Sequence, residues 1–204
     1  MKGFLEVLAG ILLQPRETIG ELARGKKLSL ALLVYSLVLF FSFAAQIIVS
    51  EQKFAQLFLG LPFFLLFMLI FLFIITAIFQ LTADFLGGQG RGLELFIGLA
   101  LSNTPYIFSA PAALLGRIEH PLAYGIYGLV NLFLFGWVLV LNIMAIQELE
   151  GFSTVKSLLV MLMPFLLFIG GMILLTLMVL VILAVFGLEN WSNFQQILSD
   201  LNYQ

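Results

Sequence analysis

Hydrophobic residues form five long stretches along the chain, and the few charged residues gather between them. A bilayer core about 30 Å thick requires about 20 apolar residues in one helix, and each stretch reaches that length. Because lipid offers no hydrogen-bond partner to a bare backbone, such stretches cross it as helices. The pattern predicts an all-α membrane protein, a bundle of five transmembrane helices with spans at Leu28–Ser50, Pro62–Ala83, Gly92–Leu115, Leu122–Ile146 and Ser157–Phe186.

The segment before the first span has the pattern of two short amphipathic helices. Apolar residues recur at helical spacing over residues 3–13, which are too few to span a bilayer. Pro15 suits the first position of a second helix, and Gly25 is expected to end it. Thr18 and Glu21 have the spacing of a capping box. We expect both helices to lie in the membrane interface.

A further amphipathic segment follows the last span. After Asn190 or Ser192 as the expected cap, apolar side chains repeat every three or four residues at Trp191, Phe194, Leu198 and Leu201. The sequence thus divides into an amphipathic segment at residues 1–27, a five-span domain at 28–187 and an outer interfacial tail at 188–204.

Composition supports a membrane location. The chain of 204 residues is 62% hydrophobic and only 10% charged, whereas a soluble domain has about a quarter of its residues charged. The length allows one bundle without a separate catalytic domain. The absence of Cys excludes disulfides and thiolate metal sites. A net charge of −2 argues neither for nor against an anionic partner, and we expect no nucleic acid among the partners.

The basic residues predict the orientation, because positive side chains favour the cytoplasmic side. Five spans place seven basic residues on one side of the membrane and two on the other, Lys53 and Arg117. We therefore expect a cytoplasmic-membrane protein with its N-terminus in the cytoplasm and its C-terminus outside. The seven are Lys2, Arg16, Arg24, Lys26, Lys27, Arg91 and Lys156.

Five residues of the N-terminal segment are candidates for contact with lipid or with a partner: Pro15, Arg16, Glu17, Lys26 and Lys27. One interpretation is a collar that binds a partner protein or lipid. The other is an anchor that only fixes the topology, since the three clustered basic residues fall below the number typical of specific anionic-lipid sites.

The third span has a seam of small residues at heptad spacing, which lets neighbouring helices approach closely. Pro105 and Pro111 each lack the amide hydrogen of a regular helix and are expected to kink or interrupt it. The side chains of Asn103 and Thr104, just before Pro105, are expected to donate hydrogen bonds to the freed carbonyls. Such a break builds substrate sites in transporters, or it serves only to pack a bent helix. The seam consists of Gly98, Ser102, Pro105, Ser109, Ala112 and Gly116.

Polar residues elsewhere in the spans are few. Asn131 and Asn142 lie on one face of the fourth span, where they either cross-link helices or line a polar path. The fifth span is longer than a bilayer requires, and we expect Pro164 and Gly170-Gly171 to bend it.

Asp84 is the acidic residue of most interest, because it stands one turn beyond Gln80 at the cytoplasmic end of the second span. We expect it at the level of the lipid headgroups. Asp84, Arg91 and Glu94 are expected to form a polar cluster around the Gly-rich loop at 87–92. This loop lacks the Lys-Ser/Thr of a P-loop and the spacing of a dinucleotide turn. We interpret it as a flexible connector.

Catalytic signals are missing from the sequence. It holds a single His and neither an HExxH, a GxSxG nor a pair of intramembrane aspartates. A nucleophile requires a base beside it to react at neutral pH. We therefore predict no enzyme activity and neither a cofactor nor a metal site.

The order of features resembles the Yip1-domain family of membrane proteins. The matching segments are the opening Leu13-Gln14-Pro15-Arg16-Glu17-Thr18, the Gly-rich turn within 86–95, Asn103-Thr104-Pro105-Tyr106, the span of Trp137, and the hinge at 149–156 before the last span. The resemblance covers nearly the whole chain. It implies five spans with a cytoplasmic N-terminus and carries over no catalytic residue.

In eukaryotes this family is associated with vesicle traffic and prenylated small GTPases. The chain resembles the compact bacterial-type members, without the long soluble N-terminal region of the eukaryotic ones. Our leading hypothesis is a non-enzymatic adaptor that organises membrane proteins or lipids, with membrane lipids, an unidentified membrane protein or a second copy as partners. The alternative is a small transporter, channel or lipid scramblase that uses the Pro-broken third span.

Overall fold

The computed structural model describes residues 4–50 and 55–201, and in these ranges the chain is helical apart from short turns. The helices are α1 Phe4–Leu13, α2 Pro15–Arg24, α3 Leu28–Ser50, α4 Ala55–Phe85, α5 Gly92–Ser102, η1 Thr104–Phe108, α6 Ser109–Ala113, η2 Leu115–Arg117, α7 Pro121–Glu150 and α8 Thr154–Leu201. The all-α fold class predicted from the sequence is confirmed.

Four segments of the described residues are long and apolar enough to cross a membrane: Leu28–Ser50, Gly60–Phe85, Pro121–Glu150 and Thr154–Phe186. They correspond to four of the five predicted spans, so the chain is a multi-pass membrane protein. The remaining predicted span, Gly92–Leu115, forms several short helices in place of one long helix.

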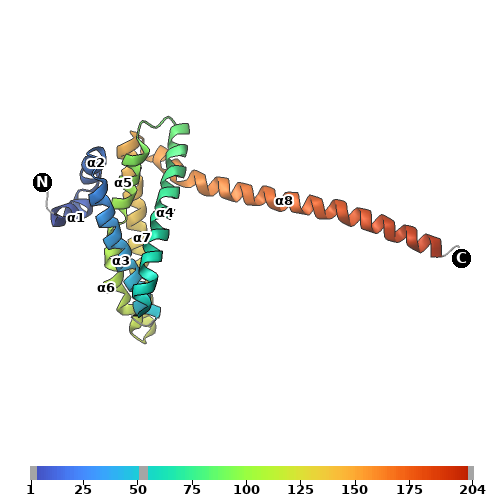
Figure 1. Ribbon diagram of the computed structural model, residues 1–204, viewed down its shortest axis with the longest axis horizontal. Coiled ribbons are helices and arrows are strands. Elements are labelled where there is room, and N and C mark those ends of the chain that lie inside the picture. The colour runs from blue at the N-terminus through green and yellow to red at the C-terminus, as the bar shows by residue number, and fades with distance from the viewer. Residues whose placement is uncertain (1–3, 51–54, 202–204) are drawn as a thin grey trace. The chain divides into compact units, whose positions relative to one another are not determined.

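The chain has two compact units, Met1–Met161 and Leu162–Gln204. In the first unit α3, α4, α5 and α7 run side by side as a bundle, with α1 and α2 against one end (Figure 1). The second unit is the continuation of α8, which passes through Pro164 and Gly170-Gly171 to Leu201 as one helix. The expected start of a new helix at Asn190 or Ser192 is therefore wrong, because the backbone hydrogen bonds continue past it.

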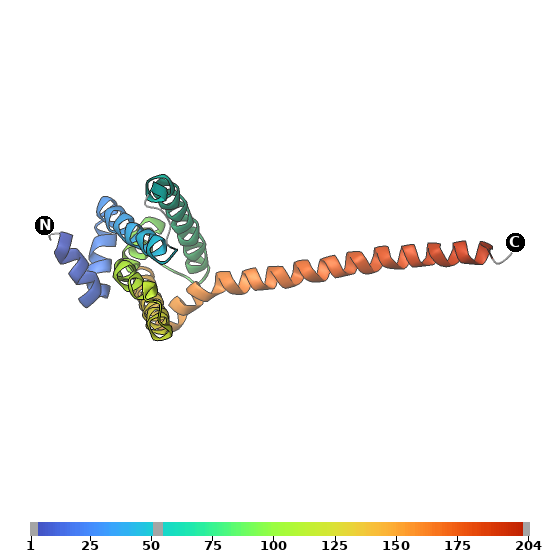
Figure 2. The same cartoon turned by 90° about the horizontal axis from the view of Figure 1, so that it is seen from below.

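The short helices α1 and α2 have the predicted bounds, but they pack as a hairpin against the bundle. Thr18, expected in a capping box, is buried within α2. A Cβ on Gly10 would lie 2.7 Å from the Thr18 hydroxyl, so the two helices are in close contact there. The N-cap of α2 is Gln14 without a side-chain hydrogen bond. The view from below shows this α1–α2 hairpin beside α3, α5 and α7 (Figure 2).

The broken segment between α5 and η2 follows α7 over most of its length. At one end, a Cβ on Gly98 would lie 2.6 Å from Cδ1 of Leu149. At the other end, a Cβ on Gly116 would lie 3.4 Å from the ring of Tyr127. Leu149 and Tyr127 are separated by about 33 Å of helix at a rise of 1.5 Å per residue.

The predicted small-residue seam is the buried face of this segment. All six seam residues are buried in the bundle. Pro105 frees the carbonyl of Leu101 from its helical partner, and the Thr104 hydroxyl donates to that carbonyl at 2.6 Å. Asn103 Nδ2 donates to the Leu99 carbonyl at 2.7 Å. The expected role of Thr104 is confirmed, while Asn103 bonds a carbonyl that Pro105 does not free.

Candidate functional site

The bundle has a polar end, which we call the loop end, where residues 86–91 join α4 to α5 and where α7 terminates. Its centre is Glu150, the last residue of α7, whose side chain is only 1% exposed. Gly151 ends the helix in the left-handed conformation, with φ of 70°. The Gly90 amide donates to Glu150 Oε2 at 2.9 Å, and the Gln89 amide donates to the Glu150 carbonyl at 3.4 Å.

The Gly-rich loop is therefore docked on α7 and is not a flexible connector. A Cβ on Gly88 or on Gly90 would collide with the carboxylate of Glu150. These two positions need glycine because the buried carboxylate occupies the space of a side chain. Gly87 needs it for a different reason, its φ of 81°.

Negative charge accumulates at this loop. Asp84 and Glu94 lie close enough for their charges to act on Glu150. Gln80 Nε2 donates to Asp84 Oδ1 at 2.8 Å. Among the described residues at this loop, two buried oxygens, Gln80 Oε1 and Glu150 Oε1, have no hydrogen-bond partner. The predicted cluster of Asp84, Arg91 and Glu94 is corrected in its composition, because Glu150 lies at its centre and no ion pair of Arg91 occurs among the described residues.

One basic side chain does reach the loop end from the first turn of α8. Lys156 Nζ donates to the Leu86 carbonyl at 3.2 Å and lies 5.3 Å from the centre of the Phe152 ring. It thereby ties the hinge after α7 to the turn after α4.

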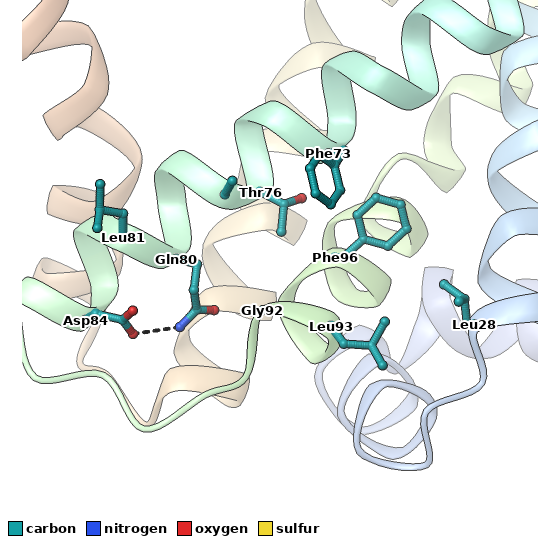
Figure 3. Close-up of a pocket in the computed structure, with 10 residues that line it drawn as sticks. Leu28, Phe73, Thr76, Gln80, Leu81, Asp84, Gly92, Leu93 and Phe96 are labelled. Atoms are coloured by element: carbon teal, nitrogen blue, oxygen red, sulfur yellow. Dashed lines mark hydrogen bonds between the residues drawn. The ribbon is translucent and has the colours of Figure 1, made fainter.

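A groove of about 610 Å³ begins at the loop end and continues along α4 and α5. We call it the loop-end groove. Its walls are apolar, and its two polar side chains at the loop end are Gln80 and Asp84 (Figure 3). The lining residues are Leu28, Phe73, Thr76, Ala77, Gln80, Leu81, Asp84, Gly92, Leu93 and Phe96.

A second polar contact fixes α2 to the last turn of α7. Arg24 donates to Glu148 Oε1 at 2.7 Å and to the Glu148 carbonyl at 2.9 Å. Arg16 donates to Gln147 Oε1 at 3.0 Å and lies 3.5 Å from Glu148 Oε2. Arg16, a candidate partner contact, thus holds the α1–α2 hairpin on the bundle.

The other candidate contacts of the N-terminal segment lie at the surface. Glu17, Lys26 and Lys27 are exposed and Pro15 is half-buried. Pro15, Arg16 and Glu17 line a shallow pocket of about 310 Å³ with Gln147 and Met144 of α7. Lys26 takes the left-handed conformation of the turn into α3, with φ of 51°, in place of the neighbouring Gly25.

The structure distributes the candidate polar-path residues over different places. Asn103 and Asn131 line one cavity of about 350 Å³ beside the break, with polar groups of Tyr35, Ser42 and Gln46. Pro105 is buried in the seam behind it. We call this the break cavity. Asp84 lines the loop-end groove. Asn142 is not among the lining residues of the groove or the break cavity, and its buried Oδ1 has no hydrogen-bond partner among the described residues.

Within the break cavity the amides bond to their own helices. Asn131 Nδ2 donates to the Tyr127 carbonyl at 2.9 Å, one turn earlier in α7. Ser109 donates in the same way to the Tyr106 carbonyl at 2.6 Å. Within the described part of the chain, Asn131 thus makes no hydrogen bond to another helix, contrary to the expected cross-link.

A model of the Yip1 domain matches residues 9–178 of the chain. The chain belongs to the Yip1 family. The matched Yip1 domain contains the loop end, both cavities and most of the α1–α2 hairpin. Neither the search of curated proteins nor the search of solved structures gave a significant match.

Sequence reasoning missed Glu150 as the centre of the polar end of this Yip1 domain. A signal was present: an acid in the last turn of an apolar helix stands at the negative end of the helix dipole, where it is unfavourable without a compensating donor. The lone His120 has a structural role, since its Nδ1 accepts the Leu122 amide at 3.2 Å and caps α7. No group of three acidic or His side chains suited to a metal occurs in the described part of the Yip1 domain.

Proposed function

We propose that the protein is a non-enzymatic adaptor of the cytoplasmic membrane, which organises membrane proteins or lipids and presents its α1–α2 hairpin to them. Members of the Yip1 family are generally non-enzymatic membrane proteins, which supports the class. A membrane protein partner and surrounding lipids are the expected ligands, with a second copy of the chain as a further candidate.

The observation that carries the proposal is the fixed position of the hairpin. Ile19 and Ala23 of α2 are fully buried, while Arg16 and Arg24 hold the hairpin to α7. Glu17, Lys26 and Lys27 remain exposed, and Glu17 also lines the shallow pocket at Pro15. A partner would therefore meet a preorganised charged surface, which lowers the entropy lost on binding.

We also propose that residues 92–117 cross the membrane, which gives five spans and puts the termini on opposite sides. The segment follows about 33 Å of α7, comparable with a hydrocarbon core of about 30 Å. With the seven basic residues on the side of the loop end, the hairpin and the Gly-rich loop face the cytoplasm.

The test is purification from native membranes in mild detergent, followed by mass spectrometry of the bound proteins. We expect a stoichiometric protein partner that is lost with Glu17→Lys or with the pair Lys26→Glu and Lys27→Glu. Glu119→Lys is the matched control, because Glu119 is exposed in the turn after η2. If the hairpin variants retained the partner and the control lost it, the hairpin would not be the binding surface. If no protein partner were found at all, the proposed adaptor function would be overturned.

The break cavity supports the second candidate function, transport along the third span. Its polar lining at Asn103 and Asn131 is the observation in favour. It ranks second because the amide donors bond within their own helices, and because no charged side chain lines the cavity among the described residues. Flux of a solute, ion or lipid through liposomes, abolished by Ser42→Phe in the cavity, would establish it. Liposomes without flux would remove it.

A further inference from the structure

We propose that the loop-end groove binds a membrane lipid whose headgroup carries a primary ammonium, with the ammonium at Asp84 and Gln80 and an acyl chain along α4 and α5. The site does not depend on the adaptor function or on the hairpin. It uses residues of α3, α4 and α5, and none of the five candidate contacts of the N-terminal segment is among the described residues that line it.

The shape of the groove suits one chain of a lipid. A volume of about 610 Å³ lies within the range of ligand sites in proteins. Phe73 and Thr76 of α4 lie opposite Phe96 of α5 (Figure 3). The groove is lined mostly by carbon, and the exposed Ala77 leaves room between its walls.

Negative charge lies at the polar end of the groove. Asp84 is exposed at the end of α4, and its hydrogen-bond partner among the described residues is the uncharged Gln80. Glu94 and Glu150 add negative charge nearby. No Lys or Arg occurs among the described residues that line the groove, and Lys156 at the loop end bonds the Leu86 carbonyl. Charge complementarity therefore favours a cationic headgroup and disfavours a purely anionic one.

A primary ammonium also fits the hydrogen-bonding groups that remain. Gln80 Oε1 is buried, without a partner, and turned toward Gly92 at the groove (Figure 3). Gly92 lies beside this oxygen, because a Cβ on it would be 4.0 Å away, in ordinary contact. An ammonium has three donors and can serve both this oxygen and the Asp84 carboxylate. A trimethylated headgroup has no N–H and cannot.

The position of the site at the membrane boundary favours a membrane lipid over other amphiphilic cations. Asp84 stands one residue before the end of α4, at the boundary between an apolar span and a polar loop. In a helix that crosses the bilayer, this boundary lies near the headgroups. A lipid with its ammonium at Asp84 would extend its chain toward the membrane interior beside Phe73.

The experiment uses the full chain in detergent and native mass spectrometry with added phosphatidylethanolamine, phosphatidylcholine or phosphatidylglycerol of identical acyl chains. We expect phosphatidylethanolamine to be retained preferentially. Asp84→Asn keeps an acceptor for Gln80 Nε2 but removes the charge, and should weaken this retention about tenfold, the scale of a charge-assisted hydrogen bond. Ala77→Phe fills the apolar part and should reduce retention of all three lipids.

Glu119→Gln is the matched control, since it also neutralises an exposed acid at the surface of the bundle. Thermal unfolding of each variant verifies its fold. Equal retention of the three lipids, or an Asp84→Asn variant that binds like the control, would overturn the proposal. So would retention of a peptide in the groove in place of lipid. The hairpin is unchanged in these groove variants. Binding of a protein partner by the hairpin is therefore tested separately from retention of lipid by the groove.

Discussion

At the break between α5 and α6, the polar side chains bond three or four residues back along their own segment, as Thr104 does to Leu101. At the loop end, the bonds connect residues far apart in the sequence: Gly90 with Glu150, Arg24 with Glu148, and Lys156 with Leu86. The first arrangement repairs a local defect in a helix. The second joins α2, α4, α5, α7 and the start of α8 into one unit.

This difference bears on where a change in the protein would be felt. A local repair can be weakened without moving any other helix, so its loss costs about one hydrogen bond. The loop end combines tight packing with hydrogen bonds between segments, and a single substitution there disturbs several contacts together. Residues that interact in this way are not additive in their effects.

The largest effect is expected for Glu150→Ala. The change leaves the Gly90 amide unpaired and opens a cavity beneath the loop, so it should lower the free energy of unfolding by about 2–5 kcal/mol. Glu150→Gln keeps the shape and an acceptor while removing a charge close to Asp84 and Glu94. We expect it to unfold at or above the temperature of the unmodified protein in detergent. Equal losses for both variants would show that the charge itself holds the loop.

Gly90→Ala tests the same region by adding one methyl group. Its Cβ would collide with the Glu150 carboxylate, and overpacking of this kind costs about 1–3 kcal/mol. Gly92→Ala is the matched control, because its Cβ would lie 3.7 Å from Gln80 Cγ in ordinary contact. A drop in the unfolding temperature for Gly90→Ala alone is the expected result. Equal behaviour of the two would contradict the docked loop.

Gly98→Ala tests the close approach of the seam to α7 and α2. The added Cβ would lie 2.6 Å from Cδ1 of Leu149, a side-chain end that can rotate away in part. We therefore expect a smaller loss, about 1–2 kcal/mol. Gly128→Ala in α7 has nothing within 4 Å of its Cβ and should instead be neutral or stabilising. Thermal unfolding in detergent measures both.

The sequence predicts what its local signals determine. Pro15 and the turn at Gly25 bound α2 as expected, and Pro105 marks the break, because each acts within one turn of its own position. Long apolar runs predict four of the spans by length alone. The heptad seam predicts the buried face of a segment even though that segment is not one helix, since small residues favour close packing in either case.

The remaining features depend on contacts between distant residues. Glu150 has no local pattern that pairs it with Gly90, so the loop between α4 and α5 could be interpreted only as a connector. Ile19 of α2 is buried beside Gly98 of α5, far from it in the sequence. An amphipathic pattern in α2 indicates one apolar face without indicating whether lipid or protein covers it.

Thr104→Val tests the local repair at the break. Valine keeps the volume but removes the hydroxyl that serves the Leu101 carbonyl, so we expect a loss of about 1 kcal/mol. Thr82→Val is the control, because the Thr82 hydroxyl bonds the Ile78 carbonyl within an unbroken helix, where the backbone amide also serves it. Comparable losses for the two would mean that the hydroxyl at the break has no special role.

The smallest effect is expected for the contact that fixes α2, where Arg24 meets Glu148 at an exposed edge of the bundle. The Arg24 side chain is 59% exposed, and exposed ion pairs contribute about 0.2–1 kcal/mol because water and salt screen them. A double-mutant cycle with Arg24→Gln and Glu148→Gln measures the coupling directly, and it should shrink as salt is raised. Because apolar burial at Ile19 holds α2 independently, the hairpin should stay docked in both variants. If Arg24→Gln exposed α2 to limited proteolysis, the ion pair rather than the buried face would hold the hairpin in place.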